Sequence, residues 1–230
     1  MAKLLAGVLE TRMETPDTKT VRLEAQGFDY RPGQFVSMKL NAGVHSFSIS
    51  VSPGKGFIEI TTKLSGSGFK NEFSELKKGG LVSIIGPSGR FVVDENEKRQ
   101  CFLVGGIGIT PFRSMLEYIA EKKLGTNVIV IYSNKTPEDI AFRKELDMLA
   151  IENKNIKIIH TITRPEESKT AWKGLTGRID AEMVERLVPD WKQRTFFVCG
   201  PPAFVDATEK FLLEMGIARE KVRVERFTGY

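Results

Sequence analysis

Residues 101–111 read Cys-Phe-Leu-Val-Gly-Gly-Ile-Gly-Ile-Thr-Pro, and residues 195–202 read Thr-Phe-Phe-Val-Cys-Gly-Pro-Pro. In both stretches a short apolar run ends at glycine and opens a segment with helical periodicity. A strand that turns on glycine into a helix leaves backbone N–H groups at the positive end of the helix dipole, which suits a phosphate or pyrophosphate. The two stretches therefore predict a dinucleotide laid across the carboxyl edge of a parallel sheet.

The chain after residue 97 alternates between apolar runs and helical periodicity. Expected strands cover residues 101–105, 127–133, 155–163 and 195–199, with a last strand from Val222. Expected helices cover residues 111–123, 137–150, 180–188 and 201–215. This order is typical of a doubly wound parallel sheet whose two faces are covered by helices.

The first 97 residues follow a period of two instead. Alternating apolar and polar residues predict strands at 20–25, 36–40, 57–62 and 81–85, separated by Gly/Pro turns, with one short helix at 69–78. Such a pattern favours a small antiparallel barrel, which we expect to have six strands. We place the boundary in the polar stretch 94–100 and predict two domains, 1–97 and 98–230.

Composition excludes several classes of function. The 230 residues carry a net charge of +5 and contain two cysteines and two histidines, so no metal site and no iron–sulfur cluster is expected. No apolar run approaches the ~20 residues that cross a bilayer, and the N-terminus lacks a convincing signal peptide. We therefore expect a cytoplasmic protein that needs an organic cofactor for any redox chemistry. No basic tract with interleaved aromatics suggests nucleic acid.

Each local motif also has a plainer interpretation. Gly106 and Gly108 form a phosphate-binding corner or serve only close packing of strand and helix. After them, Thr110 is the expected N-cap and Pro111 the expected first helical residue. Cys199 lines the ligand crevice at a strand end or is an inert buried thiol. The alternating stretch 45–52 carries four serines on one face, which suits a flat ligand or a solvated edge strand.

Taken together, six motifs in order resemble the ferredoxin–NADP reductase superfamily. The family's R-x-Y-S-x-x-S is matched by residues 45–50, its flavin-pyrophosphate loop by 63–73, and its G-P-x-G-x-F by 86–91. G-G-x-G-x-T-P matches 105–111, C-G-P-P matches 199–202, and an acid two residues before an aromatic matches 225–227. The resemblance covers nearly the whole chain.

The resemblance implies a barrel that holds FAD, with FMN possible, and a sheet domain that binds NADPH or NADH. It implies three catalytic residues, namely Ser48 near the flavin N5 with Cys199 and Glu225 in the nicotinamide pocket. Implied flavin contacts are His45, Ser46, Phe47, Ser48, Thr61, Thr62, Lys63, Gly68, Phe69, Lys70, Asn71, Phe227 and Tyr230. Implied coenzyme contacts are Gly106, Gly108, Thr110, Pro111, Arg164, Cys199 and Gly200.

Two departures bear on the cofactor. The family's arginine, which pairs with the flavin phosphates, is His45 here, and its tyrosine is Phe47. A mostly neutral imidazole offers less charge and no bidentate fork, so Lys63 or Lys70 would have to compensate. Otherwise flavin binding is expected to be weak, or FMN to be preferred.

The identity of the electron acceptor is not written in the chain. The resemblance implies an NAD(P)H-dependent flavoprotein reductase that passes electrons to a small acidic protein such as ferredoxin or flavodoxin, or to an oxygenase component. A reductase that releases free reduced flavin and an electron-transfer subunit of a larger oxidoreductase are the alternatives. Thr163-Arg164 resembles the Ser-Arg pair of NADPH-using relatives, which favours NADPH slightly.

Overall fold

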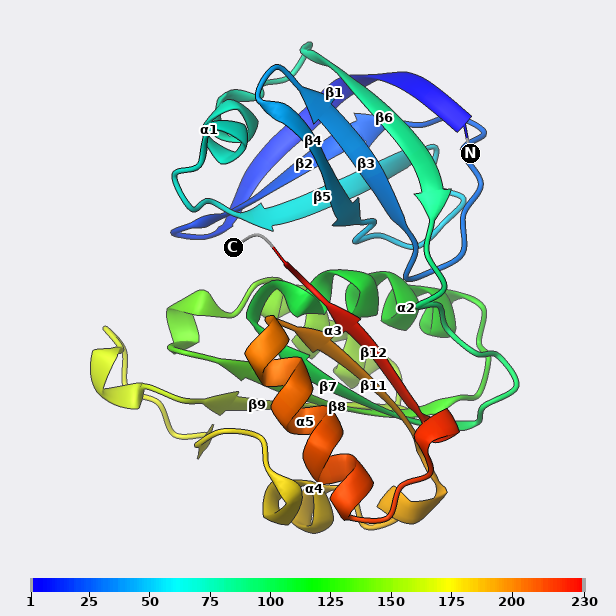
Figure 1. The fold of residues 1–230 in the computed structure, drawn as a ribbon, viewed down its shortest axis with the longest axis vertical. Coiled ribbons are helices and arrows are strands. Elements are labelled where there is room, and N and C mark those ends of the chain that lie inside the picture. Colours follow the sequence, from blue (N-terminus) through cyan, green and yellow to red (C-terminus); the bar gives the residue numbers. More distant parts are fainter. Residues whose placement is uncertain (1, 229–230) are drawn as a thin grey trace. The chain divides into compact units, whose positions relative to one another are not determined.

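The computed structural model describes residues 2–228 (Figure 1). The chain forms two compact units. The barrel unit takes the chain up to Val93 together with Thr110–Glu121, and the sheet unit takes Asp94–Ile109 and the chain from Lys122 onward. Helix α2 (Ile109–Glu121) thus belongs with the barrel although it follows the first strand of the sheet unit.

The barrel unit is an antiparallel sheet in the order β4-β3-β6-β1-β2-β5. Its strands are β1 (Ala2–Thr15), β2 (Thr18–Glu24), β3 (Phe35–Leu40), β4 (Gly43–Ser48), β5 (Phe57–Lys63) and β6 (Leu81–Ser88). A bridge between Ile49 and Ile60 joins the two end strands, which closes the sheet around an apolar core. The predicted six-stranded barrel is confirmed.

Helix α1 (Gly68–Glu75) begins one residue before the predicted range 69–78 and ends three residues before the end of that range. Ser67 is its N-cap and accepts a hydrogen bond from the Lys70 amide. At the other end the Lys19 ammonium donates to the carbonyls of Ser74 (2.6 Å) and Leu76 (2.9 Å). A buried cation on these carbonyls ends the helix by satisfying acceptors that lack an intrahelical partner.

The sheet unit is a parallel sheet in the order β10-β9-β8-β7-β11-β12. Its strands are β7 (Arg99–Gly105), β8 (Asn127–Asn134), β9 (Ile156–Ile162), β10 (Leu175–Thr176), β11 (Thr195–Gly200) and β12 (Val222–Arg226). Strands β7, β8 and β11 are buried almost throughout, as expected where both faces are covered. The predicted doubly wound parallel sheet is confirmed.

Helices cover the two faces of this sheet differently. Helices α4 (Ala181–Leu187) and α5 (Pro202–Glu214) pack in one apolar core with Cys101 and Val198 (Figure 1). Helix α3 (Arg143–Glu152) lies against β9 on the opposite face, where Asp147 contacts His160. Short 3-10 turns are η1 (Gly106–Gly108), η2 (Pro137–Asp139), η3 (Pro165–Glu167), η4 (Trp191–Gln193) and η5 (Arg219–Lys221).

The single helix expected at 137–150 is wrong. The segment begins with the 3-10 turn η2, and Phe142 then adopts φ 59° before α3 starts at Arg143. A left-handed residue cannot continue an α-helix, so the helical periodicity there is split.

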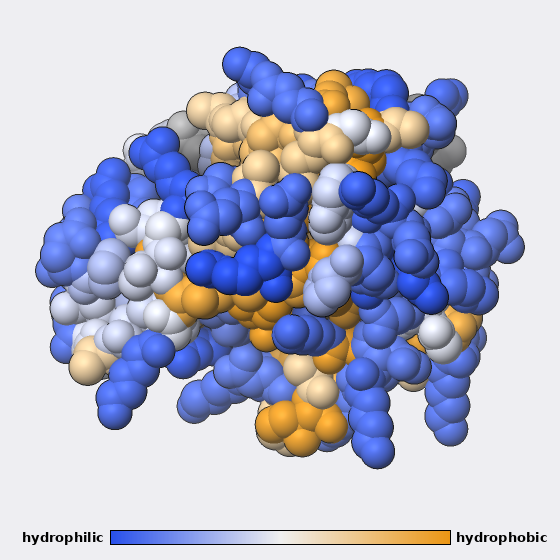
Figure 2. All heavy atoms as spheres, turned by 90° about the horizontal axis from the view of Figure 1, so that it is seen from below, coloured by the Kyte–Doolittle hydropathy of each residue, from blue (hydrophilic) through white to orange (hydrophobic). Residues whose placement is uncertain are grey.

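None of the helices within residues 2–228 is long and apolar enough to cross a membrane. Figure 2 shows a face that is mostly hydrophilic, with apolar residues in separate patches. Scattered apolar side chains are normal on protein surfaces, so this face does not by itself identify a partner surface.

Candidate functional site

The two glycine corners lie next to each other in the sheet unit. From β7 the chain continues through β8, β9 and β10 on one side, whereas β11 and β12 lie on the other side of β7. The order of the strands therefore reverses between β7 and β11, and the corners at Gly106 and Gly200 follow the carboxyl ends of these two strands. Parallel sheets bind ligands at this kind of switch point.

The glycines of the first corner differ in what surrounds them. A Cβ atom on Gly108 would lie 2.4 Å from the carbonyl oxygen of Cys199, so close packing alone requires glycine there. Gly106 has φ 52°, and a Cβ on it would meet nothing within 4 Å. Gly106 therefore presents its backbone to open space, which leaves room for a ligand to approach it closely.

The predicted N-cap at Thr110 is wrong. The 3-10 turn η1 runs directly into α2, which begins at Ile109, so Thr110 and Pro111 lie inside the first turn of the helix. Thr110 is buried. Helix α2 has no acidic residue in its first turn, which leaves the positive end of its dipole uncompensated by local charge.

Cys199 and Glu225 form a pair across β11 and β12, where they are directly opposite in the parallel register. Cys199 is fully buried, and burial together with the Glu225 carboxylate raises the pKa of its thiol well above the usual value. Burial also raises the pKa of Glu225 to about 7. Within the described part of the chain, the buried Oε2 atom of Glu225 has no hydrogen-bond partner.

The same row of the sheet continues to residues that the motifs did not single out. Cys199 is opposite Val104, Val104 is opposite Tyr132, and Tyr132 is opposite His160. Tyr132 is fully buried, and the Nε2 atom of His160 lies 3.1 Å from Asp147 Oδ1. The sequence does place polar side chains at the ends of β8 and β9. It contains no motif spacing that links Tyr132 to His160, so the motifs did not predict that these residues lie in one row.

Arg164 follows β9 as predicted. Its backbone N–H donates to the carbonyl of Lys135 (2.8 Å), and its half-exposed guanidinium pairs with Glu167 at 3.0 Å. Phe227 donates its backbone N–H to the Gly200 carbonyl (2.9 Å), which holds the chain after β12 beside the second corner. Tyr230, the other predicted aromatic shield, lies outside the described residues.

On the barrel, four of the predicted flavin residues form one cluster between β4 and α1. The rings of His45 and Phe69 have centroids 4.3 Å apart, and Phe47 packs against Phe69 (5.6 Å) and Phe73 (5.9 Å). The Lys70 ammonium lies 5.1 Å from the Phe47 centroid and donates to the Thr62 hydroxyl. Phe47 is thus buried against aromatic side chains of the chain itself.

Lys70 is the buried cation of this cluster. Its side chain comes from the first turn of α1, where no acidic residue is present, and the residue is 4% exposed. Burial lowers its pKa to about 8. His45, by contrast, is exposed.

The remaining predicted residues make contacts within the barrel unit. Lys63 forms an ion pair with Asp17 at 2.7 Å, and the Thr61 hydroxyl lies 2.8 Å from that of Thr20. Exposed Ser46 bonds the Ser37 hydroxyl (3.1 Å), and Asn71 donates to the carbonyl of Gly66 (3.3 Å). Gly68 opens α1, and Ser48 is buried at the end of β4.

The alternation expected over 45–52 is not seen in the burial of these residues, because His45 and Ser46 are both exposed. Residues 47–52 are all buried, so the serines beyond Ser46 do not form a solvated face. Ser50 donates to the carbonyl of Glu59 (3.1 Å), and Ser52 donates to a carboxylate oxygen of Glu121 (2.6 Å). These hydroxyls satisfy polar groups inside the barrel unit, which corrects the interpretation of a solvated serine face.

Comparison with known proteins agrees with this geometry. Residues 102–210 match the family described as the oxidoreductase NAD-binding domain. The glycine betaine monooxygenase reductase subunit of Pseudomonas aeruginosa is 30% identical over 225 residues, covering 93% of this chain and 61% of that protein. The NADPH oxidoreductase of Mycobacterium tuberculosis is 29% identical over 239 residues, covering 98% of this chain and 60% of that protein. The chain thus spans about three fifths of the length of these relatives.

Among solved structures, a ferredoxin NADP+ reductase from Neisseria gonorrhoeae with bound FAD and NADP matches with a TM-score of 0.84. The match covers 98% of this chain and 99% of that one at 20% sequence identity, which establishes a shared fold. Residues 102–210 are thus similar to an oxidoreductase NAD-binding domain, and the chain shares the two-part fold of a ferredoxin NADP+ reductase, as its motifs predicted.

Proposed function

We propose that this chain is a flavoprotein reductase that takes hydride from NAD(P)H onto FAD and passes the electrons to a separate acceptor. The observation that carries the proposal is the meeting of the two glycine corners at the switch point, with Cys199 and Glu225 paired beside them. The coenzyme would supply the hydride and the flavin would split it into single electrons, so the protein's own task is binding and orientation.

The sheet unit fits a pyridine dinucleotide. The open backbone at Gly106 leaves room for a pyrophosphate to approach the chain closely. The unpartnered Oε2 of Glu225 is a buried polar atom that a ligand amide would satisfy. With a pKa of about 7, the Glu225 carboxyl is able to accept or donate such a hydrogen bond at neutral pH.

The barrel unit fits the phosphate-bearing part of a flavin nucleotide. Lys70 and His45 place a buried ammonium and an exposed imidazole near the start of α1, whose first turn also lacks acids. Lys63 is engaged by Asp17, so Lys70 is the better replacement for the family's arginine. The packing of Phe47 on Phe69 and Phe73 gives less support to a stacking role, which remains a prediction.

For the acceptor we propose an oxygenase component, because one relative is named a monooxygenase reductase subunit. Ferredoxin or flavodoxin and free flavin are the competing acceptors. A specific observation favours free flavin as the second candidate: His45 replaces a bidentate arginine, and weak flavin binding would allow exchange. A cytoplasmic location is proposed from the sequence alone.

The experiment is an anaerobic titration of the purified protein, reconstituted with FAD and separately with FMN. We expect one flavin per chain to be retained on gel filtration, and NADPH or NADH to bleach its visible absorbance. Retained flavin that neither coenzyme reduces would contradict hydride transfer. Failure to retain either flavin, together with rapid reduction of flavin added in excess, would select the free-flavin reductase. Neither binding nor reduction would overturn the proposal.

A further inference from the structure

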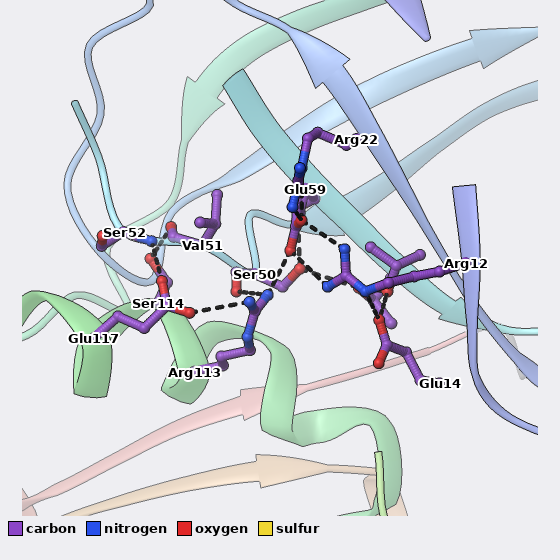
Figure 3. A network of polar contacts seen from close by, with 12 residues as sticks. Arg12, Glu14, Arg22, Ser50, Val51, Ser52, Glu59, Arg113, Ser114 and Glu117 are labelled. Carbon is purple, nitrogen blue, oxygen red and sulfur yellow. Dashed lines mark hydrogen bonds and ion pairs between the residues drawn. The ribbon is translucent and has the colours of Figure 1, made fainter. Parts of the chain in front are cut away.

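Glu59, in the middle of β5, is a fully buried carboxylate held by three guanidinium groups (Figure 3). Arg12 of β1 reaches its two oxygens at 2.7 and 3.0 Å. Arg22 of β2 donates to Oε1 through Nε (3.0 Å) and Nη2 (2.8 Å). Arg113 of α2 donates to Oε2 at 2.6 Å. None of the sequence motifs includes this cluster.

The Glu59 carboxyl stays ionised at neutral pH. Burial alone would raise the pKa of its carboxyl, but the hydrogen bond from Arg12 and the charge of Arg113 lower that pKa to about 2. A buried ion cluster of this kind is weak as a source of net stability, since desolvation offsets the attraction. In some proteins such a cluster instead fixes one arrangement of the elements that carry the charges.

Arg113 connects Glu59 to helix α2, on which it lies. Its Nη1 also donates to the carbonyl of Ser50 (2.8 Å), and its Nη2 pairs with Glu117 one turn later (3.0 Å). Ser114 donates to the carbonyl of Val51 (2.6 Å), and Glu117 accepts from the backbone N–H of Ser52 (2.9 Å). Two successive turns of α2 are therefore bonded to residues 50–52, and through Glu59 to β5 (Figure 3).

The part of α2 that this cluster fixes is next to the predicted pyrophosphate residues. Thr110 precedes Arg113 by three residues, which is just under one helical turn. A helix held at Arg113, Ser114 and Glu117 has little freedom to rotate or slide at Thr110. Affinity for a ligand at a helix N-terminus depends on where the first N–H groups point, and a misplacement of about 1 Å is costly.

We propose that Glu59 and Arg113 are positioning residues for the coenzyme, acting by fixing the first turn of α2 for the pyrophosphate. The inference rests on the proposed function, because it requires that this turn binds a pyridine dinucleotide. Neither residue needs to touch the ligand. The pair acts equally on NADPH and NADH, because both coenzymes carry the same pyrophosphate.

The chain offers a matched control in Arg22. Arg113→Gln and Arg22→Gln each remove one guanidinium from Glu59 and leave two, so neither strands a bare buried carboxylate. Of these two arginines, Arg113 lies on α2 and Arg22 lies on β2. Both variants and the wild-type chain are titrated with NADP+ and with NAD+ by calorimetry, and each is unfolded in urea to measure stability.

We expect Arg113→Gln to weaken both coenzymes by about tenfold, in the range by which remote residues alter affinity, and Arg22→Gln to stay within about twofold of wild type. Arg113→Gln should also lose more stability than Arg22→Gln, because it gives up the bonds to Ser50 and Glu117 as well, so affinities are compared where both variants are folded. Equal affinities in the two variants would overturn the inference and leave the proposed function standing. A wild-type chain that binds neither NADP+ nor NAD+ would overturn the proposed function and this inference with it. If Arg113→Gln does not fold, Arg113→Lys is compared with Arg22→Lys, with the same direction expected.

Discussion

Gly108 lies against the end of β11 so closely that a Cβ on it would be 2.6 Å from the carbonyl carbon of Cys199. The same Cβ would lie 2.7 Å from the amide nitrogen of Gly200. Both contacts are with backbone, which cannot yield as a flexible side chain does. The turn that opens α2 and the strand end that carries Cys199 are therefore one packed unit.

Gly108→Ala should destabilise the sheet unit by about 3 kcal/mol, at the upper end of overpacking, because the methyl group has no space. Urea unfolding followed by fluorescence of the two tryptophans, Trp172 and Trp191, measures it. Gly125→Ala is the control, since Gly125 has φ 67° with nothing within 4 Å of its Cβ position. That variant carries only backbone strain and should lose about 1–2 kcal/mol. Equal losses would contradict the steric argument.

Glu225 should make stability fall as pH rises through its folded-state pKa of about 7. Because burial raises that pKa above the ordinary 4.5, the folded state holds the proton more tightly, and the benefit is complete below pH 4.5. Raising the pH from 4.5 to 8 should therefore cost roughly 2–3 kcal/mol from this group.

Glu225→Gln should remove that dependence, which urea unfolding at pH 5 and pH 8 would reveal. Glu214→Gln, at an exposed position on α5, serves as the control. If wild type and Glu225→Gln had the same free energy of unfolding at both pH values, the pKa of the Glu225 carboxyl would not be perturbed.

The glycine corners were predictable because their chemistry is local. Gly106 and Gly200 both show left-handed or extended glycine backbone at strand ends, as the apolar runs before them indicated. The missed strand β1 has a different cause. Only Ala6, Val8 and Thr15 are buried along it, and its pairing with β2 contains two register shifts. Its hydrophobic period is therefore broken, and sequence pattern alone gave no strand there.

The cluster around Glu59 was unpredictable for another reason. Arg113 and Glu59 are 54 positions apart, and nothing in the spacing of charges along β5 or α2 marks them as partners. The strand alternation placed Glu59 beside Ile58 and Ile60 as one more polar residue. Only the three-dimensional fold shows that this carboxylate faces inward. The serines at 50 and 52 were misread on the same ground, because their partners lie in β5 and α2.

Cys199→Ala should slow reduction of bound flavin by NADPH while leaving the flavin absorbance spectrum unchanged, since the thiol is paired with Glu225 in the predicted nicotinamide pocket. Stopped-flow reduction measures the rate. Cys101→Ala is a matched control, because Cys101 is equally buried but belongs to the apolar core with α4 and α5. Removing one buried sulfur costs packing in both variants. Unchanged reduction kinetics in Cys199→Ala would assign this cysteine to packing alone.

Arg164→Ala should raise KM for NADPH by about tenfold and leave KM for NADH unchanged, if the guanidinium pairs with the 2′-phosphate. The half-exposed side chain is paired with Glu167, so its guanidinium remains accessible to an added phosphate. Arg99→Ala is the control, because Arg99 is also an exposed arginine paired with a carboxylate, but at the amino end of β7. Steady-state kinetics with NADPH and with NADH measure the two KM values for each variant. Equal changes for NADPH and NADH would exclude a 2′-phosphate contact.

Lys70 should give the flavin-free protein a stability that rises with pH in the alkaline range. Burial lowers its folded-state pKa to about 8 from the ordinary 10.5, so the unfolded chain binds the proton more tightly between these values. Raising the pH from 8 to 10.5 should therefore add roughly 2–3 kcal/mol from this group. Lys70→Met should abolish the rise, measured by urea unfolding at pH 8 and pH 10, whereas Lys63→Met, at a half-exposed lysine paired with Asp17, should not.

The same ammonium should tie flavin affinity to pH in the opposite sense. A phosphate group binds the protonated lysine, so above pH 8 binding must draw in a proton, and FAD affinity should fall by up to tenfold per pH unit. In Lys70→Met the affinity should be lower at pH 7 and nearly independent of pH. In Lys63→Met it should keep the wild-type slope. A slope lost in Lys63→Met but kept in Lys70→Met would assign the role of the missing arginine to Lys63 and leave Lys70 as a buried structural cation.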